Sequence, residues 1–260
     1  MDVMTEETLV KRSSGFTLTE LLVLAPITFL LGAVLLASLG DAQQKVQAAA
    51  CLANMRQWGL AMGMYCNDYH DYMPYEGSPT SPIDAGFNLG AWFNVLPPYM
   101  HQASLKDLYT SVPPITPLPG QRSVYLCPSV TSPRADYTGT PTTSHPYFGY
   151  AMNRLLTGIS GKLYQRSIAA LPAQVIMFSE SENNEFPWTD GYFIGPNSPV
   201  LTPPRHFGGM NFVFVDGHAQ WYLLADYGRP APMTTPQSAQ IEWAVPRAVY
   251  WFPCRTCNKG

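Results

Sequence analysis

The sequence predicts an α+β protein in which one long N-terminal helix packs against an antiparallel β-sheet that carries long loops. Three observations support this class: an apolar run near the N-terminus, a helical apolar pattern that continues it, and several short segments rich in β-branched and aromatic residues. The 25 prolines and 20 glycines, with serine and threonine around them, predict long ordered loops and confine helix to one region.

The apolar run extends from Phe16 to Leu39 and contains a single charge, Glu20. At about 1.5 Å per residue, a helix of this length crosses a hydrocarbon core of about 30 Å. Lys11 and Arg12 stand just before it, so the positive-inside rule keeps the short N-terminus in the cytoplasm and places the rest of the chain outside. A cleaved signal peptide is the alternative, but its apolar region is usually shorter and ends at a small-residue cleavage site.

The pattern after Gly40 is that of an amphipathic helix. Apolar or small residues recur at spacings of three and four, which places them on one helical face. They are residues 51, 55, 58, 62, 65 and 69. We expect the helix to end between Asp68 and Pro74, with its apolar face packed on a sheet.

The remaining chain is dense in proline, glycine and aromatic residues. Its best strand candidates are YFGYAMNRLL, SIAALPAQVIMFSES and MNFVFVDGHAQWYLL. We therefore divide the chain into a short N-terminal segment (1–15), a transmembrane helix (16–39), an amphipathic outer helix (40–73) and a globular domain (74–260).

The last strand candidate predicts a hairpin with a two-residue turn at Asp216 and Gly217, because such turns favour Asp-Gly. This turn would pair Phe212 with Trp221, Phe214 with Ala219 and Val215 with His218. Paired residues share a face of the sheet. One face would then be an apolar core face formed by residues 212, 214, 219 and 221, and the other would carry residues 211, 218 and 220.

The N-terminal segment KRSSGFTLTELL resembles the type IV pilins and type II secretion pseudopilins. In that family the leader ends in glycine, phenylalanine follows, and glutamate is the fifth mature residue. Gly15, Phe16 and Glu20 stand at this spacing. The resemblance implies that residues 1–15 are a prepilin leader, and that a prepilin peptidase cuts after Gly15 and methylates the new amine of Phe16. It also implies that Glu20 pairs with the Phe16 amine of a neighbouring subunit, which would satisfy a costly carboxylate inside an apolar span.

The segment RHFGGMNFVFVDGH resembles the prepilin-associated H-X9-DG domain, with His206 followed after nine residues by Asp216 and Gly217. The segments CLANMRQWGLAMGMY and YLCPS fit the same family, so the resemblance covers most of the chain, and it places the H-X9-DG hairpin at 206–222. It implies a bacterial inner-membrane protein with one membrane pass and its C-terminal domain in the periplasm, or on a cell-surface filament. The implied partners are other pilin-like subunits, the prepilin peptidase, an assembly platform of a secretion or pilus system, and membrane lipid.

His206, Asp216 and His218 are candidate metal ligands, because imidazole and carboxylate groups near one hairpin can converge on a cation. The competing interpretation assigns Asp216 to the turn and gives His206 a hydrogen bond to a loop or to the turn itself. Calcium is suggested by the resemblance alone, and there is no dense acidic run of the EF-hand kind. We predict no resident cofactor.

The five cysteines are Cys51, Cys66, Cys127, Cys254 and Cys257, and those beyond the anchor would lie in an oxidising compartment. Cys254 and Cys257 form a CxxC pair, which suits a redox pair or half of a zinc site; a small disulfide loop or an unpaired tail is the simpler interpretation. The resemblance of the segments around Cys51 and Cys127 implies that they are neighbours and form a structural bridge. Cys66 is then the remaining thiol.

Charge and motifs exclude several functional classes. A net charge of −3 without a basic run outside the leader argues against a nucleic-acid partner. The sequence has no recognisable nucleophile motif or phosphate-binding loop, so we do not expect an enzyme. Two alternatives remain: a membrane-anchored module that binds a secreted substrate or polysaccharide through residues 75–200, and a metal-dependent enzyme that uses His206, Asp216 and His218.

Overall fold

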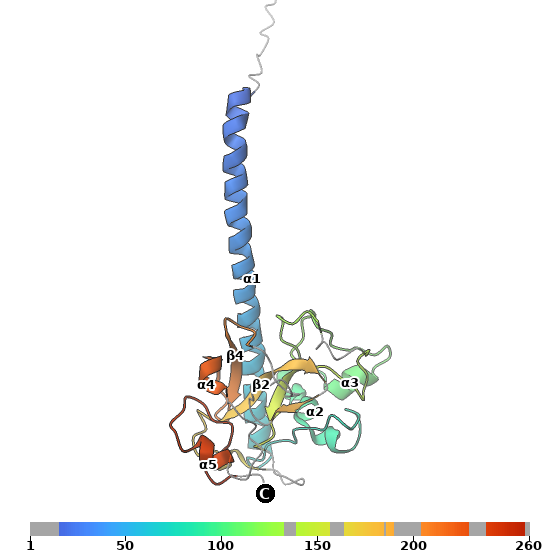
Figure 1. The fold of residues 1–260 in the computed structure, drawn as a ribbon. Coiled ribbons are helices and arrows are strands. Elements are labelled where there is room, and N and C mark those ends of the chain that lie inside the picture. The colour runs from blue at the N-terminus through green and yellow to red at the C-terminus, as the bar shows by residue number, and fades with distance from the viewer. Residues whose placement is uncertain are drawn as a thin grey trace, which may run out of the picture. The chain divides into compact units, whose positions relative to one another are not determined.

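The computed structural model describes residues 16–132, 139–156, 164–184, 186–189, 204–228 and 238–257. The chain forms two compact units, Met1–Gln43 and Gln44–Gly260. Helix α1 (Leu18–Asp68) begins in the first unit and ends in the second (Figure 1). The predicted leader, including Gly15, lies outside the described residues.

A capping box starts helix α1. The backbone N–H groups of Thr17 and Glu20 donate to each other's side chains, over 2.8 Å to Glu20 Oε2 and 3.3 Å to Thr17 Oγ1. The Thr17 hydroxyl also donates to Glu20 Oε2, over 2.8 Å. This reciprocal arrangement satisfies two backbone donors that the first helical turn would otherwise leave unpaired. Glu20 therefore stabilises the start of its own helix.

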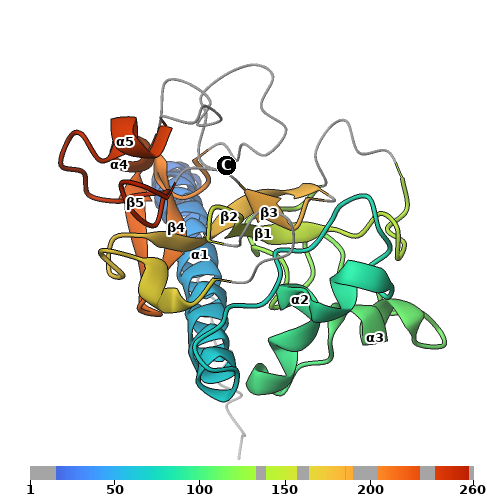
Figure 2. The same ribbon diagram turned by 90° about the horizontal axis from the view of Figure 1, so that it is seen from below.

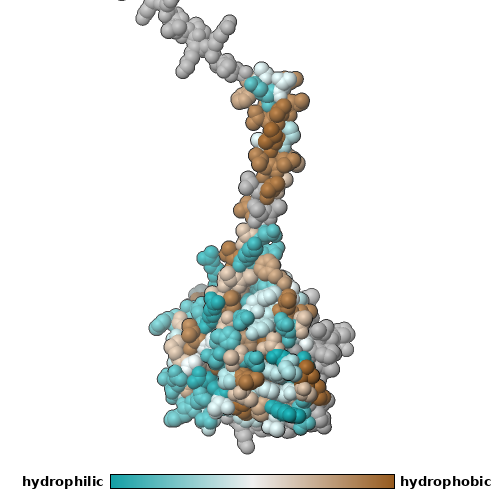
Figure 3. Space-filling view, turned by 90° about the vertical axis from the view of Figure 1, so that its left-hand side faces the viewer, coloured by the Kyte–Doolittle hydropathy of each residue, from teal (hydrophilic) through white to brown (hydrophobic). Residues whose placement is uncertain are grey.

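The N-terminal part of α1 has an apolar surface that the first unit does not bury. Large side chains from Phe16 to Leu39 are exposed, including Leu18, Phe29 and Leu36. Figure 3 shows this surface as a nearly continuous brown stretch. Among the described residues, α1 is a helix long and apolar enough to cross a membrane, which is consistent with a single-pass anchor.

In the second unit, α1 buries the predicted apolar stripe. Five of its six positions are buried: Cys51, Met55, Trp58, Met62 and Tyr65. Tyr69 follows the last helical residue and is about half exposed. The stripe predicted the buried face at five of its six positions, and the helix ends at Asp68, within the expected range.

The sheet has five strands in the order β3-β1-β2-β4-β5. Their bounds are β1 (Phe148–Asn153), β2 (Ile176–Asn184), β3 (Trp188–Thr189), β4 (Gly209–Phe214) and β5 (Ala219–Leu223). Four strands pair antiparallel as predicted, whereas the two-residue β3 runs parallel to β1 and makes the sheet mixed. Such a short strand carries too few residues for a period-2 pattern. The α+β class is confirmed.

The predicted hairpin register is wrong by one residue. Phe212 pairs with Gln220, and Trp221 pairs with Asn211. The loop holds three residues, since Gly217 N–H donates to Phe214 O and Phe214 N–H donates to His218 O. Gly217 has a φ of 92°, as expected for a turn that ends in a left-handed glycine.

This register also changes the predicted faces of the hairpin. Both faces of β4 are buried, because a hydrophobic core lies on each side of it. Phe212 and Phe214 pack with Trp251 and Phe252 of the C-terminal segment, whereas Val213 and Val215 join the core that contains α1. Trp221 was predicted to share a face with Phe212, but the two side chains lie on opposite faces of the hairpin.

Short helices surround the sheet. They are η1 (Gly86–Gly90), α2 (Trp92–Val95), η2 (Pro97–Met100), α3 (Leu105–Thr110), η4 (Arg166–Ile168), α4 (Leu224–Tyr227) and α5 (Ser238–Glu242). Figure 2 shows α4 and α5 at the β5 end of the sheet, with α2 and α3 away from it. The ring of Trp92, in α2, packs edge-on against Trp58 at a centroid distance of 4.9 Å. This contact brings α2 into the core next to α1.

The tip of the β4–β5 hairpin touches the backbone of α1 at Gly59. A Cβ atom at Gly59 would lie 2.4 Å from Gly217 O and 2.9 Å from Val213 Cγ1. These separations are far below van der Waals contact, so only glycine allows the hairpin to approach α1 this closely. A Cβ atom at Gly63, one turn further along, would meet only Arg166 Nη1, at 4.0 Å.

We predict that Gly59→Ala lowers the free energy of unfolding by at least about 1 kcal/mol, because the new methyl group overpacks the contact with the hairpin. Gly63→Ala is the matched control. It should be neutral or stabilise by up to about 1 kcal/mol, because alanine favours helix and the site has room. Thermal unfolding of the full chain in detergent, followed by near-ultraviolet circular dichroism, measures both. Equal melting temperatures for Gly59→Ala and the unchanged chain would contradict the contact.

Candidate functional site

Four side chains with metal-binding or nucleophilic atoms converge in the second unit. They are Cys51, Cys127, Glu180 and His206, and one donor atom from each lies within 4.8 Å of the others. None of these residues is more than 3 % exposed. They are widely separated in the sequence, and we call them the Cys-Cys-Glu-His cluster.

The outer half of α1 supplies Cys51 and holds the loop that supplies Cys127. Asn54 Nδ2, in α1, donates to Ser123 O over 3.0 Å and to Leu126 O over 3.3 Å. Trp58 Nε1 donates to Val124 O over 2.9 Å. These bonds join the loop backbone to α1, so the two thiols lie close together.

Strand β2 supplies Glu180. Glu180 pairs with Tyr150 of β1, and both side chains point to the core that contains α1. Asn211 Nδ2, on β4, donates to Glu180 Oε1 over 2.7 Å. The amide therefore fixes the position of the buried carboxylate.

A tight turn before β4 supplies His206. The backbones of His206 and Gly209 exchange hydrogen bonds of 3.1 and 3.0 Å, and the residues between them, Phe207 and Gly208, have φ values of 53° and 78°. Positive φ at both central residues is typical of a type I′ turn, which glycine at the second position favours. Trp221 Nε1 also donates to His206 O over 2.7 Å. The imidazole thus lies on a rigid backbone.

The four donor atoms form a chain of short contacts. Cys51 Sγ donates to Glu180 Oε1 over 2.8 Å. His206 Nε2 lies 3.1 Å from Glu180 Oε1 and 3.4 Å from Cys127 Sγ. Tyr150 Oη lies 3.4 Å from Cys51 Sγ and accepts a hydrogen bond from Asn54.

Contacts within the cluster shift the pKa values of its members in different directions. Burial raises the pKa of Cys51 well above its usual value, so this thiol keeps its proton. Hydrogen bonding with Cys51, helped by His206, lowers the pKa of Cys127 to about 5. Burial alone would lower the pKa of His206, but hydrogen bonds with Cys127 and Glu180 outweigh it and raise that pKa to about 9.

Glu180 and Arg205 complete the charge distribution. Burial favours a protonated Glu180, but its hydrogen bond and ion pair with His206 lower the pKa of the carboxyl. The nearby charge of Arg205 acts in the same direction on Glu180 and on Cys127. The side chain of Arg205 also donates to Ser181 O. The cluster therefore concentrates anionic groups next to cationic ones in a place that excludes water.

This arrangement supports three kinds of chemistry: coordination of a metal ion, a disulfide between the two sulfurs, and nucleophilic attack by the Cys127 thiolate. Nucleophilic catalysis needs access for a substrate. Cys51 and Cys127 have no exposed surface. Metal coordination and disulfide formation need no such access, and they fit the buried position better.

The structure does not join His206 with Asp216 and His218 as the sequence-based metal hypothesis required. Asp216 Oδ1 accepts from the backbone N–H of His218 and lies 2.6 Å from its Nδ1, at the exposed tip of the hairpin. Strand β4 lies between this pair and His206. Asp216 therefore has the turn role that the competing interpretation gave it.

The predicted disulfide between Cys51 and Cys127 is not formed. The two residues are neighbours, as expected, but both are free thiols that hydrogen-bond to each other, and their sulfurs also contact Glu180 and His206 respectively. Cys66 is a buried free thiol outside the cluster, and burial raises its pKa to about 12. The CxxC pair, Cys254 and Cys257, forms a small disulfide loop with a Cα–Cα distance of 5.1 Å.

Sequence reasoning missed Glu180 and Asn211. Asn211 stands between apolar residues in MNFVFV, whereas Glu180 follows the apolar run VIMF and stands between two serines. A carboxylate or amide in a strand with both faces buried needs a polar partner, so its presence there is a signal of a buried polar site. That signal does not identify the polar partner, because the partners belong to other elements that are distant in the sequence.

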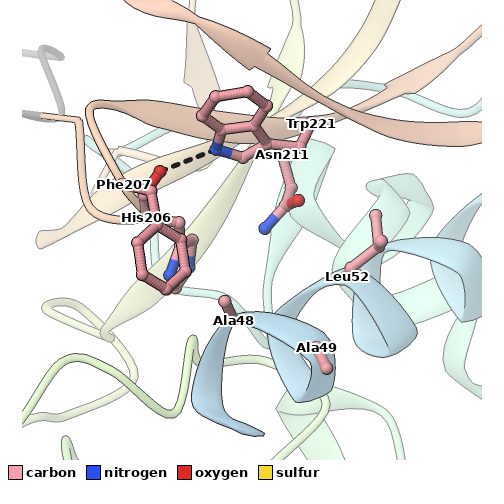
Figure 4. Close-up of a pocket in the computed structure, with 7 residues that line it drawn as sticks. All are labelled: Ala48, Ala49, Leu52, His206, Phe207, Asn211 and Trp221. Atoms are coloured by element: carbon pink, nitrogen blue, oxygen red, sulfur yellow. Dashed lines mark hydrogen bonds between the residues drawn. The ribbon is translucent and has the colours of Figure 1, made fainter. Parts of the chain in front are cut away.

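A hollow of about 340 Å³ adjoins the cluster (Figure 4). His206 and Asn211 line it, and both also contact Glu180. Its other walls are Ala48, Ala49 and Leu52 of α1 and Phe207 and Trp221 on the hairpin side. This hollow is mostly apolar and reaches the edge of the cluster at the imidazole.

The family comparison assigns the chain by residues 43–182, more than half of its length. They match the family described as a protein of unknown function, DUF1559, which comprises bacterial pilin-like, prepilin-type proteins. The chain belongs to the DUF1559 family. No curated protein and no solved structure matches it.

The DUF1559 match covers three members of the cluster. Cys51, Cys127 and Glu180 lie inside residues 43–182, whereas His206 lies beyond them in the hairpin. The membrane-type segment from Phe16 to Leu39 also lies outside the match. The cluster thus joins the matched region to the segment that follows it.

We predict that Cys51, Cys66 and Cys127 are all alkylated when the unreduced protein is denatured in the presence of a chelator and an alkylating reagent. The structural reason is that none of the three takes part in a disulfide. Cys254 and Cys257 serve as the internal control, because cleavage after Arg255 leaves two peptides joined by their disulfide. Recovery of a peptide that bridges Cys51 and Cys127 would contradict the free-thiol arrangement.

Proposed function

We propose that this DUF1559 protein is a non-enzymatic pilin-like subunit of a type II secretion or type IV pilus-like system. Its N-terminal helix anchors it in the bacterial inner membrane, with the second unit on the periplasmic side. Prepilin peptidase cuts after Gly15, and the mature chain assembles through the helix with other pilin-like subunits on an assembly platform. Assembly could carry the second unit to a cell-surface filament.

The observation that carries this proposal is the exposed apolar surface from Phe16 to Leu39 together with one carboxylate, Glu20, at its start. Lipid can cover the apolar side chains but cannot satisfy a carboxylate, which costs a few kcal/mol inside a membrane span. A neighbouring Phe16 amine would supply the missing opposite charge. The family membership of the chain supports the same role.

The capping box gives Glu20 a second role that a test must separate from assembly. Glu20 accepts from the N–H and hydroxyl of Thr17 within its own chain. A glutamine at position 20 can still accept these hydrogen bonds, since Glu and Gln both serve in capping boxes. It has no charge, so it cannot form an ion pair with an amine.

We predict that Glu20→Gln is inserted and cleaved normally but does not enter sheared filaments or cross-link to other pilin-like subunits. The uncompensated amine left in the apolar helix bundle usually costs several kcal/mol. Thr17→Val is the matched control, since it removes the capping hydroxyl and keeps the charge; it should assemble. Normal assembly of Glu20→Gln would favour the alternative function, a membrane-anchored module that binds a secreted substrate or polysaccharide.

We also predict that the mature protein begins with N-methylated Phe16. Intact-mass analysis of the membrane fraction measures this directly. Gly15→Leu should keep residues 1–15, because the bulky side chain occupies the peptidase junction, whereas Ser14→Ala should be processed like the unchanged chain. A different mature terminus in cells with active prepilin peptidase would rule out this processing.

A further inference from the structure

We propose that Cys51, Cys127, Glu180 and His206 coordinate one zinc ion that ties α1 to the sheet and to the H-X9-DG segment. The proposal does not depend on filament assembly, since every residue it uses lies in the second unit. It is carried by the convergence of four buried donor side chains on one point. We refer to this position as the zinc site.

The donor types select the metal. Thiolate sulfur and imidazole nitrogen suit zinc, whereas calcium and magnesium prefer all-oxygen sites. Four protein donors fill a tetrahedral coordination sphere and leave no position for water or substrate. A closed sphere of this kind is typical of structural zinc sites and not of catalytic ones.

The geometry needs little adjustment. Bond lengths of about 2.3 Å to sulfur and about 2.0–2.2 Å to nitrogen and oxygen place tetrahedral zinc donors about 3.4 to 3.8 Å apart. Three donor pairs are in direct contact, from 2.8 Å for Cys51 Sγ to Glu180 Oε1 to 3.4 Å for Cys127 Sγ to His206 Nε2, and all four donor atoms lie within 4.8 Å of one another. Side-chain shifts of about 1 Å adjust these pairs to the separations of a zinc site. The protons held by the thiol and the imidazolium leave to solvent on binding.

The charges balance at the zinc site. Two thiolates and one carboxylate are three negative charges, and a neutral imidazole adds none. One zinc ion together with the guanidinium of Arg205, which acts on Cys127 and Glu180, supplies three positive charges. A buried carboxylate and thiolates are costly without such compensation.

Groups around the four donors hold them in place. Asn211 donates to Glu180, and Tyr150 contacts Cys51 while accepting from Asn54. Partners of this kind orient metal ligands and are a regular part of metal sites. A disulfide between the same two sulfurs would use neither the carboxylate nor the imidazole that lie against them.

A route for the ion also exists. The hollow beside the cluster is lined by His206 and Asn211, and one turn of α1 forms its opposite wall (Figure 4). An ion that enters it meets the imidazole first. Once bound, zinc would join segments separated by up to 155 positions, from Cys51 to His206, and closing long loops restricts the unfolded chain.

The test uses the full chain, purified from membranes in detergent, with zinc content measured by mass spectrometry of the metal. We expect about one zinc per chain, and at least a tenfold weaker affinity for zinc in Cys51→Ser and in Glu180→Gln. Cys66→Ser is the matched control: it removes a buried free thiol of the same helix outside the cluster, and it should keep the ion. Equal zinc content in all four proteins would overturn the proposal.

Cobalt(II) added to the metal-free chain gives a second readout that does not depend on how the variants fold. Tetrahedral cobalt with thiolate ligands should produce a near-ultraviolet charge-transfer band and visible absorption, and added zinc should remove both. The melting temperature of the unchanged chain should also fall with a chelator and return with zinc chloride. Absence of the cobalt bands, or a Cys51–Cys127 disulfide in protein taken from membranes, would overturn the zinc site.

Discussion

The apolar face of the outer half of α1 is the surface against which the globular unit is built. Met55, Trp58 and Met62 have no exposed surface. Full burial of side chains of this size contributes about 1.5–3 kcal/mol each. The same face holds the loop through Trp58 Nε1 and meets the hairpin tip at Gly59. Each of these contacts requires that α1 remain a regular helix here, so that these residues point to the same side.

This constraint explains why nine residues separate His206 from Asp216. His206 lies before β4 and takes part in the cluster with Cys51, whereas Gly217 lies after β4 and touches Gly59. The residues between them form the strand that crosses this part of α1. Residues at both ends of this strand therefore lie against groups of α1. A zinc ion bound at the His206 end would make that contact depend on metal.

Periodicity and turn chemistry predicted much of the fold from the sequence. The three-and-four spacing found the buried face of α1 because a helix with one packed face leaves that pattern. The hairpin was found from Asp-Gly, but its register was missed by one residue, since a three-residue loop with a left-handed Gly217 uses the same dipeptide. The two-residue β3 left no pattern to detect.

The site was less predictable for a physical reason. Its residues come from a helix, a loop, a strand and a turn, and no local spacing encodes their convergence. The resemblance implied that Cys51 and Cys127 are neighbours, and the sequence indicated His206 as a candidate metal ligand. Glu180 could be recognised as a site residue only from the sheet, which places it opposite Tyr150 and beside Asn211. Buried polar residues in apolar strands are the signal that sequence reasoning can use in such cases.

The family membership, the exposed apolar start of α1 and the position of Glu20 together support the proposal that this protein is a subunit that works by assembly. The most direct measurement is quantitative mass spectrometry of sheared surface filaments and of the membranes from which they were removed. The account predicts that peptides of this chain, including one that starts at N-methylated Phe16, occur in the filament fraction with other pilin-like subunits. Confinement of the chain to the membrane fraction, in cells that make such filaments, would contradict it.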